Sequence, residues 1–224
     1  SEFKYFIKLS QDFSQEYVSN DMLTVPAGMS GNRILKIAQF SGLAGLEFIA
    51  GVPTTVGGMV AMNFGCWGEE FAEWVDKVHI MDETGNCFWV ENKEMDFAYR
   101  SSCISSNNWI ILEVVFKLRK ESPVKIHKKS QEMIQLRLSK QPLRENTFGS
   151  VFKNPPNDYA GRIIEELGYK GKPFTKQLSM SEAHANFMVN NNGTYRDAVN
   201  LIKDIQKRAA EEKSVKLELE VKLT

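Results

Sequence analysis

Ser150 is the first residue of this sequence whose type and surroundings suggest chemistry. It follows Gly149 in the run Thr147–Pro155, and Lys153 and Asn154 come shortly before the final proline of that run. Glycine lets a backbone approach a ligand closely, and a serine hydroxyl can both donate and accept a hydrogen bond. Lysine and asparagine add a cation and an amide, and proline ends a strand because it has no N–H for a ladder. The run alone fits either a ligand-binding turn or an edge strand that ends in a polar turn.

A candidate cation and a candidate acid lie elsewhere in the chain. Arg100 follows Tyr99 and precedes two serines, and its guanidinium matches a carboxylate because it is a planar fork that stays protonated. Glu218 and Glu220 alternate with apolar residues in the run Leu217–Val221. That alternation also fits a half-buried strand with a solvated acidic face, and Arg100 also fits an ordinary residue at the end of a strand.

The segment Gly45–Gly65 is dense in glycine. Such a loop usually wraps closely around something, and its backbone N–H groups can surround a pyrophosphate, aided by the dipole of a following helix. The segment lacks the G-x-G-x-x-G spacing of dinucleotide-binding turns and the G-x-x-x-x-G-K-[ST] spacing of phosphate-binding loops. A tightly packed structural turn and a ligand-binding loop therefore both fit it.

Local patterns predict the elements of the first part of the chain. Ser30 can cap a helix with an apolar face from Ile34 to Ala38, and Gly42 can end that helix. Alternation and turn residues predict strands at Met22–Ala27, Lys77–Met81, Cys87–Glu91 and Trp109–Leu118. The turn Asp82–Asn86 joins the second and third of these as a hairpin. In the last strand we expect one face to carry Ile110, Leu112, Val114 and Phe116.

A break at Glu121-Ser122-Pro123 marks the predicted domain boundary, with one domain at residues 1–122 and another at residues 123–224. In the second domain we expect helices at Val124–Ser139, Tyr159–Leu167 (closed by Gly168) and Thr194–Lys213. We expect strands around Ser150, near Ala185–Val189 and at Val215–Leu223. Helices and strands do not alternate regularly, so the order favours an α+β fold over a regular doubly wound sheet.

Composition excludes several classes of protein. The 224 residues are 42% apolar and 25% charged, and Lys+Arg and Asp+Glu both number 28, so nothing indicates a polyanionic partner such as nucleic acid. The basic run Lys125–Lys129 fits a solvated helix face better than a nucleic-acid contact. Three widely spaced cysteines fit free thiols in a reducing compartment and no metal site. No apolar run is long enough to span a membrane and no signal-peptide pattern opens the chain, so we expect a cytoplasmic protein.

The motifs around Arg100, Ser150 and Glu220, in this order, resemble the active-site signatures of the UDP-N-acetylenolpyruvoylglucosamine reductase family of peptidoglycan precursor synthesis. The resemblance runs from about Tyr5 to Thr224, and the decapeptide Ser181–Asn190 is very close to the family form. It implies a FAD-binding domain of the vanillyl-alcohol-oxidase/PCMH type, followed by a smaller α+β substrate-binding domain. The short interval between Arg100 and Ser150 leaves little room for an extra capping lobe, so the chain is similar to the shorter subgroup of the family.

The glycine-dense segment resembles the flavin-binding core of that family, whose usual form is close to Ile-Pro-Gly-Thr-Val-Gly-Gly followed by Met-Asn-Ala-Gly. Thr54 stands where the family usually has glycine and Phe64 where it usually has alanine. The resemblance implies FAD contacts from Gly51, Val52, Pro53, Thr54, Thr55, Gly57, Gly58, Asn63 and Gly65. Family members begin with a further lobe that carries a Gly-x-Gly-Ser-Asn type loop, which this sequence does not show. We therefore expect a fragment or a divergent member in which FAD binding is weakened.

The implied reaction has two halves: NADPH reduces FAD, and the reduced flavin gives a hydride to the enolpyruvyl group of UDP-N-acetylglucosamine enolpyruvate, forming UDP-N-acetylmuramate. Negative charge then develops beside the carboxylate, which calls for a nearby cation and a proton donor. The resemblance assigns Ser150 as the donor, Arg100 as the cation, and Glu220 to charge stabilisation or proton supply. It places residues on the substrate side, namely Tyr99, Arg137, Gln141, Lys153, Asn154 and His184. The segments Tyr159–Arg162 and Lys170-Gly171 resemble those that face the nucleotide sugar.

Two rival hypotheses stay open at this point. One is a flavin-free module that binds the UDP-sugar without a redox step, which the absent loop and Thr54 favour. The other is a flavin oxidoreductase with a different substrate. Under the reductase hypothesis we expect a monomer with no nucleic-acid, membrane or metal partner.

Overall fold

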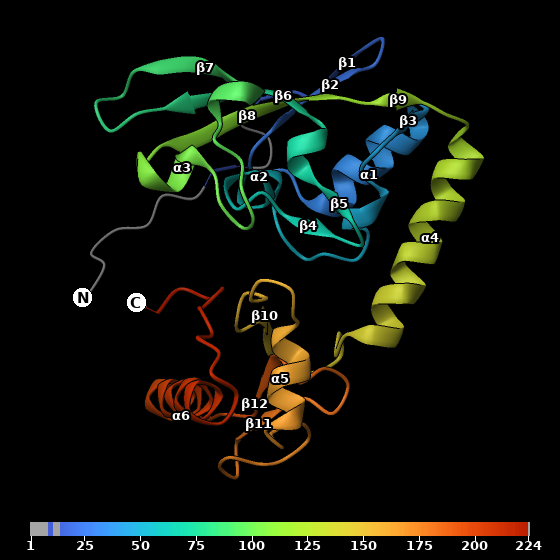
Figure 1. The fold of residues 1–224 in the computed structure, drawn as a ribbon. Coiled ribbons are helices and arrows are strands. Elements are labelled where there is room, and N and C mark those ends of the chain that lie inside the picture. The colour runs from blue at the N-terminus through green and yellow to red at the C-terminus, as the bar shows by residue number, and fades with distance from the viewer. Residues whose placement is uncertain (1–8, 11–13, 224) are drawn as a thin grey trace. The chain divides into compact units, whose positions relative to one another are not determined.

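The computed structural model describes residues 9–10 and 14–223 (Figure 1). The chain divides into two compact units, residues 1–135 and residues 136–224, and each has a hydrophobic core of its own. Helix α4 (Pro123–Lys140) runs across this division. The predicted boundary between residues 122 and 123 lies at the first residue of α4, where proline is favoured because its missing N–H would have no helical partner. This boundary stays a prediction, because α4 contributes residues to both units.

The first unit is built on an antiparallel sheet of five strands in the order β1-β2-β8-β6-β7. In that order the strands are β1 (Tyr17–Ser19), β2 (Met22–Pro26), β8 (Ile110–Lys117), β6 (Val75–Met81) and β7 (Cys87–Glu91). Two short pairs accompany the sheet, β3 (Leu43–Ala44) with β9 (Arg119–Lys120) and β4 (Gly65–Cys66) with β5 (Glu69–Glu70). The four predicted strands are confirmed, and so is the hairpin: Asp82 Oδ1 accepts hydrogen bonds from the N–H groups of Thr84 and Asn86, both at 2.9 Å.

The expected alternation along β8 is interrupted. Ile111 and Val114 both belong to the first core, although they are three positions apart. The pairing of β6 with β8 shifts register between His79 and Ile80, and this leaves Leu112 as an extra residue in β8. A bulge of this kind changes which side chains face the core. Leu112 is buried as expected, but Ile111 rather than Leu112 belongs to the first core cluster.

The helices of the first unit begin and end at the predicted signals. In α1 (Gly31–Phe40), Ser30 is the N-cap, with its Oγ accepting from the N–H of Arg33 at 3.3 Å, and Gly42 follows the helix with φ +64°. The other helices are α2 (Val56–Ala61), α3 (Cys103–Ser106) and the 3₁₀ turns η1 (Glu47–Ile49), η2 (Phe71–Glu73) and η3 (Asn92–Glu94). Figure 1 shows α1 and α2 beneath the five-stranded sheet, and their buried side chains join those of the strands in one core.

The second unit packs two helices with an antiparallel sheet of three strands in the order β10-β12-β11. The strands are β10 (Thr147–Ser150), β12 (Phe187–Asn190) and β11 (Leu178–Met180), and the helices are α5 (Ala160–Glu166) and α6 (Tyr195–Lys213). Thr194 and Asp197 form a capping box at the start of α6, and Gly168 follows α5 with φ +80°. The predicted helices are confirmed, as is the expected placing of Ser150 on an edge strand.

The predicted strand Val215–Leu223 was wrong. Only Leu219 in that segment forms a bridge, with Phe152. On either side of this bridge the N–H of Lys153 donates to the carbonyl of Glu218 at 2.8 Å, and the N–H of Glu220 donates to the carbonyl of Val151 at 2.9 Å. Toward Val215 the pairing stops because two prolines follow Asn154 in the partner segment, and proline cannot donate to a ladder.

Within the described ranges, 9–10 and 14–223, no helix is both long and apolar enough to cross a membrane. Cys66, Cys87 and Cys103 are free thiols. In the same ranges no three His, Cys, Asp or Glu residues are grouped as ligands of a metal ion.

Candidate active site

The glycines of the predicted flavin loop allow close packing of its backbone. Gly51 has φ +80°, a conformation that favours glycine, and it leads into the N-cap residue of α2, Thr55. A Cβ atom on Gly57 would lie 2.9 Å from the Cβ of Ala27, so this glycine lets α2 approach the end of β2. A Cβ atom on Gly65 would lie 2.9 Å from the carbonyl oxygen of Glu69 in the β4–β5 pair. A structural requirement therefore accounts for each of these three glycines.

The first backbone N–H groups of α2 are bonded within the protein. Val56 N–H donates to the carbonyl of Met29 and Gly57 N–H to the carbonyl of Ala27, each at 2.8 Å. Gly58 N–H donates to Thr55 Oγ1 at 3.3 Å. We expected N–H groups of this loop and helix to surround a pyrophosphate. These three N–H groups instead have hydrogen-bond partners within the protein.

Threonine hydroxyls are among the donors that the loop can offer FAD. Gly58 is exposed, and a Cβ atom there would lie 3.3 Å from the Oγ1 atoms of both Thr54 and Thr55. A hydroxyl that accepts one hydrogen bond can still donate its own hydrogen, so these side chains suit phosphate and ribityl oxygens. The loop therefore fits FAD through the surface formed by Pro53, the two threonines and Gly58. Thr54, which departs from the usual family residue, adds a hydroxyl to this surface.

Asn63 is fully buried and acts as a structural link. Its Oδ1 accepts from the N–H of Ala72 at 2.9 Å, and its Nδ2 donates to the carbonyl of Ala98 at 3.2 Å. Its backbone has φ +42°, which asparagine tolerates better than most residues. The predicted FAD contact of Asn63 thus remains a prediction, while its amide connects the flavin loop to the segment that precedes Arg100.

Arg100 lies beside the flavin loop. It has φ +54° in a tight turn in which Ala98 and Ser101 exchange backbone hydrogen bonds at 3.1 and 3.0 Å. Its Nη2 donates to the carbonyl of Gly65 at 2.9 Å, and the exposed ring of Tyr99 lies 5.0 Å from its Cζ. The structure thus brings the predicted cation next to a predicted cofactor residue 35 positions away in the chain.

In the second unit the backbone brings Ser150 and Glu220 onto neighbouring segments. Gly149 has φ +88° within a bulge between Thr147 and Ser150, and a Cβ atom on this glycine would meet open space. The N–H of Glu220 donates to the carbonyl of Val151, the residue that follows Ser150. Both predicted catalytic side chains are half-buried. A bulge next to a functional residue commonly redirects its side chain.

Asn186 is a residue of this region to which the sequence analysis assigned no role. Its Oδ1 accepts from the N–H of Phe152 at 3.0 Å and its Nδ2 donates to the carbonyl of Phe152 at 2.8 Å. Its own carbonyl accepts from the N–H of Val151 at 2.9 Å. The buried amide thus pairs with the chain just after Ser150 as another strand would. Its place in the decapeptide Ser181–Asn190 was the only signal in the sequence.

We expect Asn186→Ala to lower the free energy of unfolding of the second unit by roughly 2–5 kcal/mol, because it leaves a buried N–H and a buried C=O without partners. Urea unfolding followed by circular dichroism measures this change. Asn191→Ala is the matched control, since Asn191 is exposed on the loop after β12. Equal stability of the Asn186 and Asn191 variants would contradict the role given to the amide.

His184 packs against the start of α5. Its Nδ1 accepts from the N–H of Asn186 at 3.2 Å, its ring meets Phe187 edge to face at 5.0 Å, and a Cβ atom on Gly161 would lie 2.9 Å from its Cε1. Burial, and then the positive charge of Lys170, lower the pKa of His184 below its ordinary value of 6.5. The ring is therefore neutral near pH 7, with its hydrogen on Nε2, and can donate from that atom.

This pKa shift predicts a pH dependence of stability. The folded state resists protonation of His184, so stability is lost as the pH falls from 6.5 through the lowered pKa, by at most about 1.4 kcal/mol per pH unit. His184→Asn places an amide oxygen near the position of Nδ1 and does not titrate, so it should remove this slope. Unfolding free energies measured across the window test the prediction, with exposed His127→Asn as the control. An unchanged slope in His184→Asn would contradict it.

The other predicted substrate-side residues make local contacts. Arg137 is buried in the last turn of α4, where its Nη1 donates to Gln141 Oε1 at 3.2 Å. Asn154 Oδ1 accepts from the N–H of Ala160 at 3.0 Å, so it supports the start of α5. The N–H of Lys153 joins the bridge to the segment of Glu220. These contacts orient Gln141 and Asn154 without exhausting their polar atoms.

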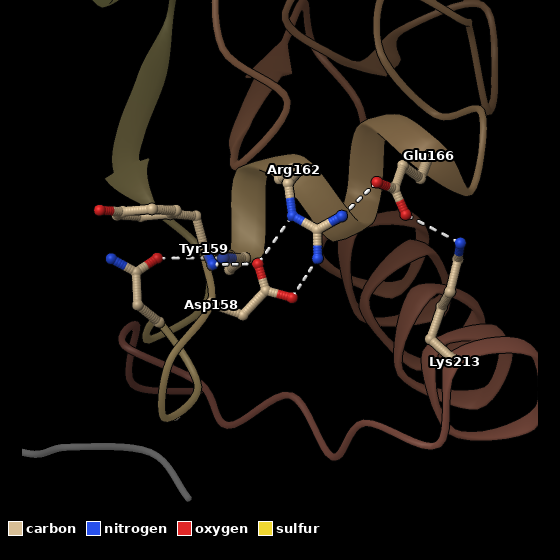
Figure 2. Close-up of polar contacts among 7 residues, drawn as sticks. Asp158, Tyr159, Arg162, Glu166 and Lys213 are labelled. Atoms are coloured by element: carbon tan, nitrogen blue, oxygen red, sulfur yellow. Dashed lines mark hydrogen bonds and ion pairs between the residues drawn. The ribbon is translucent and has the colours of Figure 1, made fainter.

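Arg162, expected near the nucleotide sugar, belongs to a chain of exposed ion pairs. Figure 2 shows its guanidinium between Asp158 and Glu166, with Lys213 bonded to Glu166. Hydrogen bonding to Arg162 lowers the pKa of the Asp158 carboxyl, and Lys213 followed by Arg162 lowers that of Glu166. Because two carboxylates compensate this cation, a diphosphate would have to compete with them for it.

Comparison with known proteins gives this geometry a context. A sequence model described as a FAD binding domain matches residues 4–91, and one described as the C-terminal domain of UDP-N-acetylenolpyruvoylglucosamine reductase matches residues 141–224. The chain is 39% identical to the UDP-N-acetylenolpyruvoylglucosamine reductase of Caldanaerobacter subterraneus subsp. tengcongensis, over 92% of this chain and 68% of the relative. The chain belongs to the UDP-N-acetylenolpyruvoylglucosamine reductase family.

Further members of the reductase family agree with this assignment. The enzyme of Bacillus pumilus is 36% identical over 97% of this chain and 72% of its own length, and that of Rickettsia rickettsii is 38% identical over 96% and 73%. The crystal structure of the reductase from Thermus caldophilus matches with a TM-score of 0.82 and 30% identity, covering 96% of this chain and 76% of the other.

Membership of the reductase family confirms several predictions. The α+β fold is a FAD-binding domain followed by the smaller C-terminal domain of these reductases. The protein is a FAD-dependent oxidoreductase, which speaks against the flavin-free binding module. The individual site residues stay predictions that rest on the geometry given above.

Proposed function

We propose that this protein reduces UDP-N-acetylglucosamine enolpyruvate to UDP-N-acetylmuramate with NADPH as the reductant, as a step of peptidoglycan precursor synthesis. The observation that carries the proposal is the contact between Arg100 and the carbonyl of Gly65, because it puts a cation beside the flavin loop of a reductase family member. The flavin loop would hold FAD, which would supply the redox chemistry needed to move a hydride from NADPH to the enolpyruvyl double bond.

Arg100 has the chemistry to stabilise the charge that this reduction creates. Hydride addition at the far carbon places negative charge on the carbon next to the carboxylate. A guanidinium can bind that carboxylate through two parallel N–H groups and stays protonated while the charge develops. We assign this role to Arg100.

Ser150 is our proposed proton donor to the same carbon, and Glu220 the residue that assists it. A serine hydroxyl is a weak acid, so it needs a partner that supplies a proton or stabilises its charge. The backbone bond from Glu220 to Val151 supports this pairing, because it holds the glutamate on the segment next to the serine.

We also assign residues to the binding of the UDP-sugar substrate. Six residues are our proposed contacts to the UDP-sugar, namely Tyr99, Lys153, Asn154, Arg137, Gln141 and His184. His184 enters as a neutral hydrogen-bond donor, in keeping with its lowered pKa. NADPH and UDP-sugars are coenzymes and metabolites of the cell interior, so we also propose a cytoplasmic protein, acting as a monomer.

Product analysis tests the proposal. The purified protein with FAD is incubated with NADPH and UDP-N-acetylglucosamine enolpyruvate. The UDP-sugar is then isolated, and its mass is measured by mass spectrometry. We expect one product with two more hydrogen atoms, formed in equal amount to the NADPH consumed. NADPH consumption that does not depend on the enolpyruvyl sugar, with the sugar recovered unchanged, would instead indicate a flavin oxidoreductase with another substrate.

A further inference from the structure

Phe64 lies near the end of the flavin-binding segment of the first unit and is held by several contacts. Its N–H donates to the carbonyl of Met59 at 2.7 Å. Its ring stacks on that of Phe48, with centroids 6.2 Å apart and an interplanar angle of 12°. Phe48 is itself fully buried and packs edge to face on Phe71 at 5.6 Å. The position of the Phe64 ring is therefore set by the core of the unit.

The guanidinium of Arg100 lies over this ring. The Cζ of Arg100 is 5.8 Å from the centroid of Phe64 and 5.0 Å from that of Tyr99. Both distances fall within the range of about 6 Å at which an aromatic face attracts a cation. The carbonyl that accepts the hydrogen bond from Nη2 belongs to Gly65, the next residue after Phe64. One short segment thus contributes both a ring and a carbonyl to the same guanidinium.

These contacts act on Arg100 in different ways. The hydrogen bond fixes the direction of one N–H group, whereas the aromatic attraction acts on the charge and uses no N–H group. The arginine backbone has φ +54°, a conformation uncommon for a residue with a side chain, so its side chain leaves the turn from an unusual direction. The planar ring of Phe64 therefore limits the positions that the Arg100 side chain can take.

We propose that Phe64 is a positioning residue of this reductase, which orients the Arg100 guanidinium toward the carboxylate and the developing charge of the substrate. Alanine, the usual family residue at this position, has no ring that could make the contact. The residue at position 64 then determines how firmly the guanidinium of Arg100 is held in place. The inference rests on the proposed role of Arg100.

Phe64→Leu and Phe64→Tyr separate this role from packing. Leucine retains most of the buried volume and loses the aromatic face, whereas tyrosine retains both. In anaerobic stopped-flow experiments on the FAD-loaded enzyme, we expect Phe64→Leu to slow flavin reoxidation by the enolpyruvyl substrate about 3- to 30-fold. Flavin reduction by NADPH should stay unchanged, and Phe64→Tyr should restore reoxidation to near the wild-type rate. Phe40→Leu, at an exposed position on α1, is the matched control.

A second measurement reports on Arg100 without any turnover. The Nε–Hε signal of Arg100 in a ¹⁵N NMR spectrum is sensitive to nearby ring currents, so it should move in Phe64→Leu and stay in Phe40→Leu. Slowed reoxidation with an unmoved Arg100 signal would overturn the proposal, as would slowed reoxidation in Phe64→Tyr equal to that in Phe64→Leu. If Arg100→Met leaves reoxidation unchanged, the proposed function of Arg100 fails, and the NMR shift still decides separately whether the Phe64 ring lies against Arg100.

Discussion

Ser150→Ala is expected to slow reduction of the enolpyruvyl group by about 10²–10⁴-fold, the usual contribution of a positioned general acid, and to leave flavin reduction by NADPH unchanged. The methyl group of alanine has no proton to donate, while the first half-reaction does not use the serine. Anaerobic stopped-flow absorbance of the flavin measures the two half-reactions separately.

The control for this variant is Ser179→Ala, because Ser179 lies on β11 of the same three-stranded sheet. We expect wild-type rates in both half-reactions. Loss of NADPH-dependent flavin reduction in Ser150→Ala, or full retention of the second half-reaction, would remove Ser150 from its proposed role.

Arg100→Met is expected to lower the rate of the second half-reaction by about 10²–10³-fold, a range typical of removing one group that stabilises transition-state charge. Methionine keeps an unbranched side chain but has neither the charge nor the hydrogen bond to Gly65. Arg100→Lys should recover part of the rate, because an ammonium keeps the charge but lacks the planar fork that binds a carboxylate through two bonds. Reoxidation rates across a range of substrate concentrations separate this loss from weaker binding.

The outcome that contradicts the role of Arg100 is an equal loss in both half-reactions. Because Nη2 bonds to Gly65, such a result would indicate that the substitution disturbs the flavin loop rather than charge stabilisation. The flavin spectrum of the variant shows directly whether that loop still binds the cofactor as in the wild type.

The parts of the fold that could be predicted depend on local chemistry. Ser30 and Thr194 can cap helices whatever surrounds them, and Gly42 can take the positive φ that ends a helix. Proline at position 123 suits the first position of α4, because an N–H there would have no partner within the helix. Such signals involve neighbours within a few residues, so the sequence contains all that is needed to find them.

The errors in the fold come from distant partners. The alternation of Leu217–Val221 suits a strand, but only one bridge forms, and toward Val215 the partner segment runs into two prolines. The bulge at Leu112, beside which Ile111 joins the first core cluster, arises in the pairing of β8 with β6. Neither partner can be recognised from the segment itself, since strand pairing depends on residues far away in the chain.

In the candidate active site, too, local motifs could be read from the sequence and distant contacts could not. Arg100, Ser150 and Glu220 were predicted as site residues from their family motifs, but their contacts in the fold were not predicted. The bond from Arg100 to Gly65 spans 35 positions and that from Asn186 to Phe152 spans 34. The N–H groups at the start of α2 looked like phosphate donors, yet Met29 and Ala27 accept their hydrogens from another part of the unit. A motif indicates candidate reacting groups, whereas the groups that would orient them depend on the folded chain.

The visible absorption spectrum of the purified protein tests the central claim most directly. It is recorded without oxygen, first with FAD bound, then after NADPH is added, and then after UDP-N-acetylglucosamine enolpyruvate is added. We predict an oxidised flavin spectrum that bleaches with NADPH and returns with the enolpyruvyl sugar. A flavin that bleaches with NADPH and stays bleached when the enolpyruvyl sugar is added would contradict the proposed function.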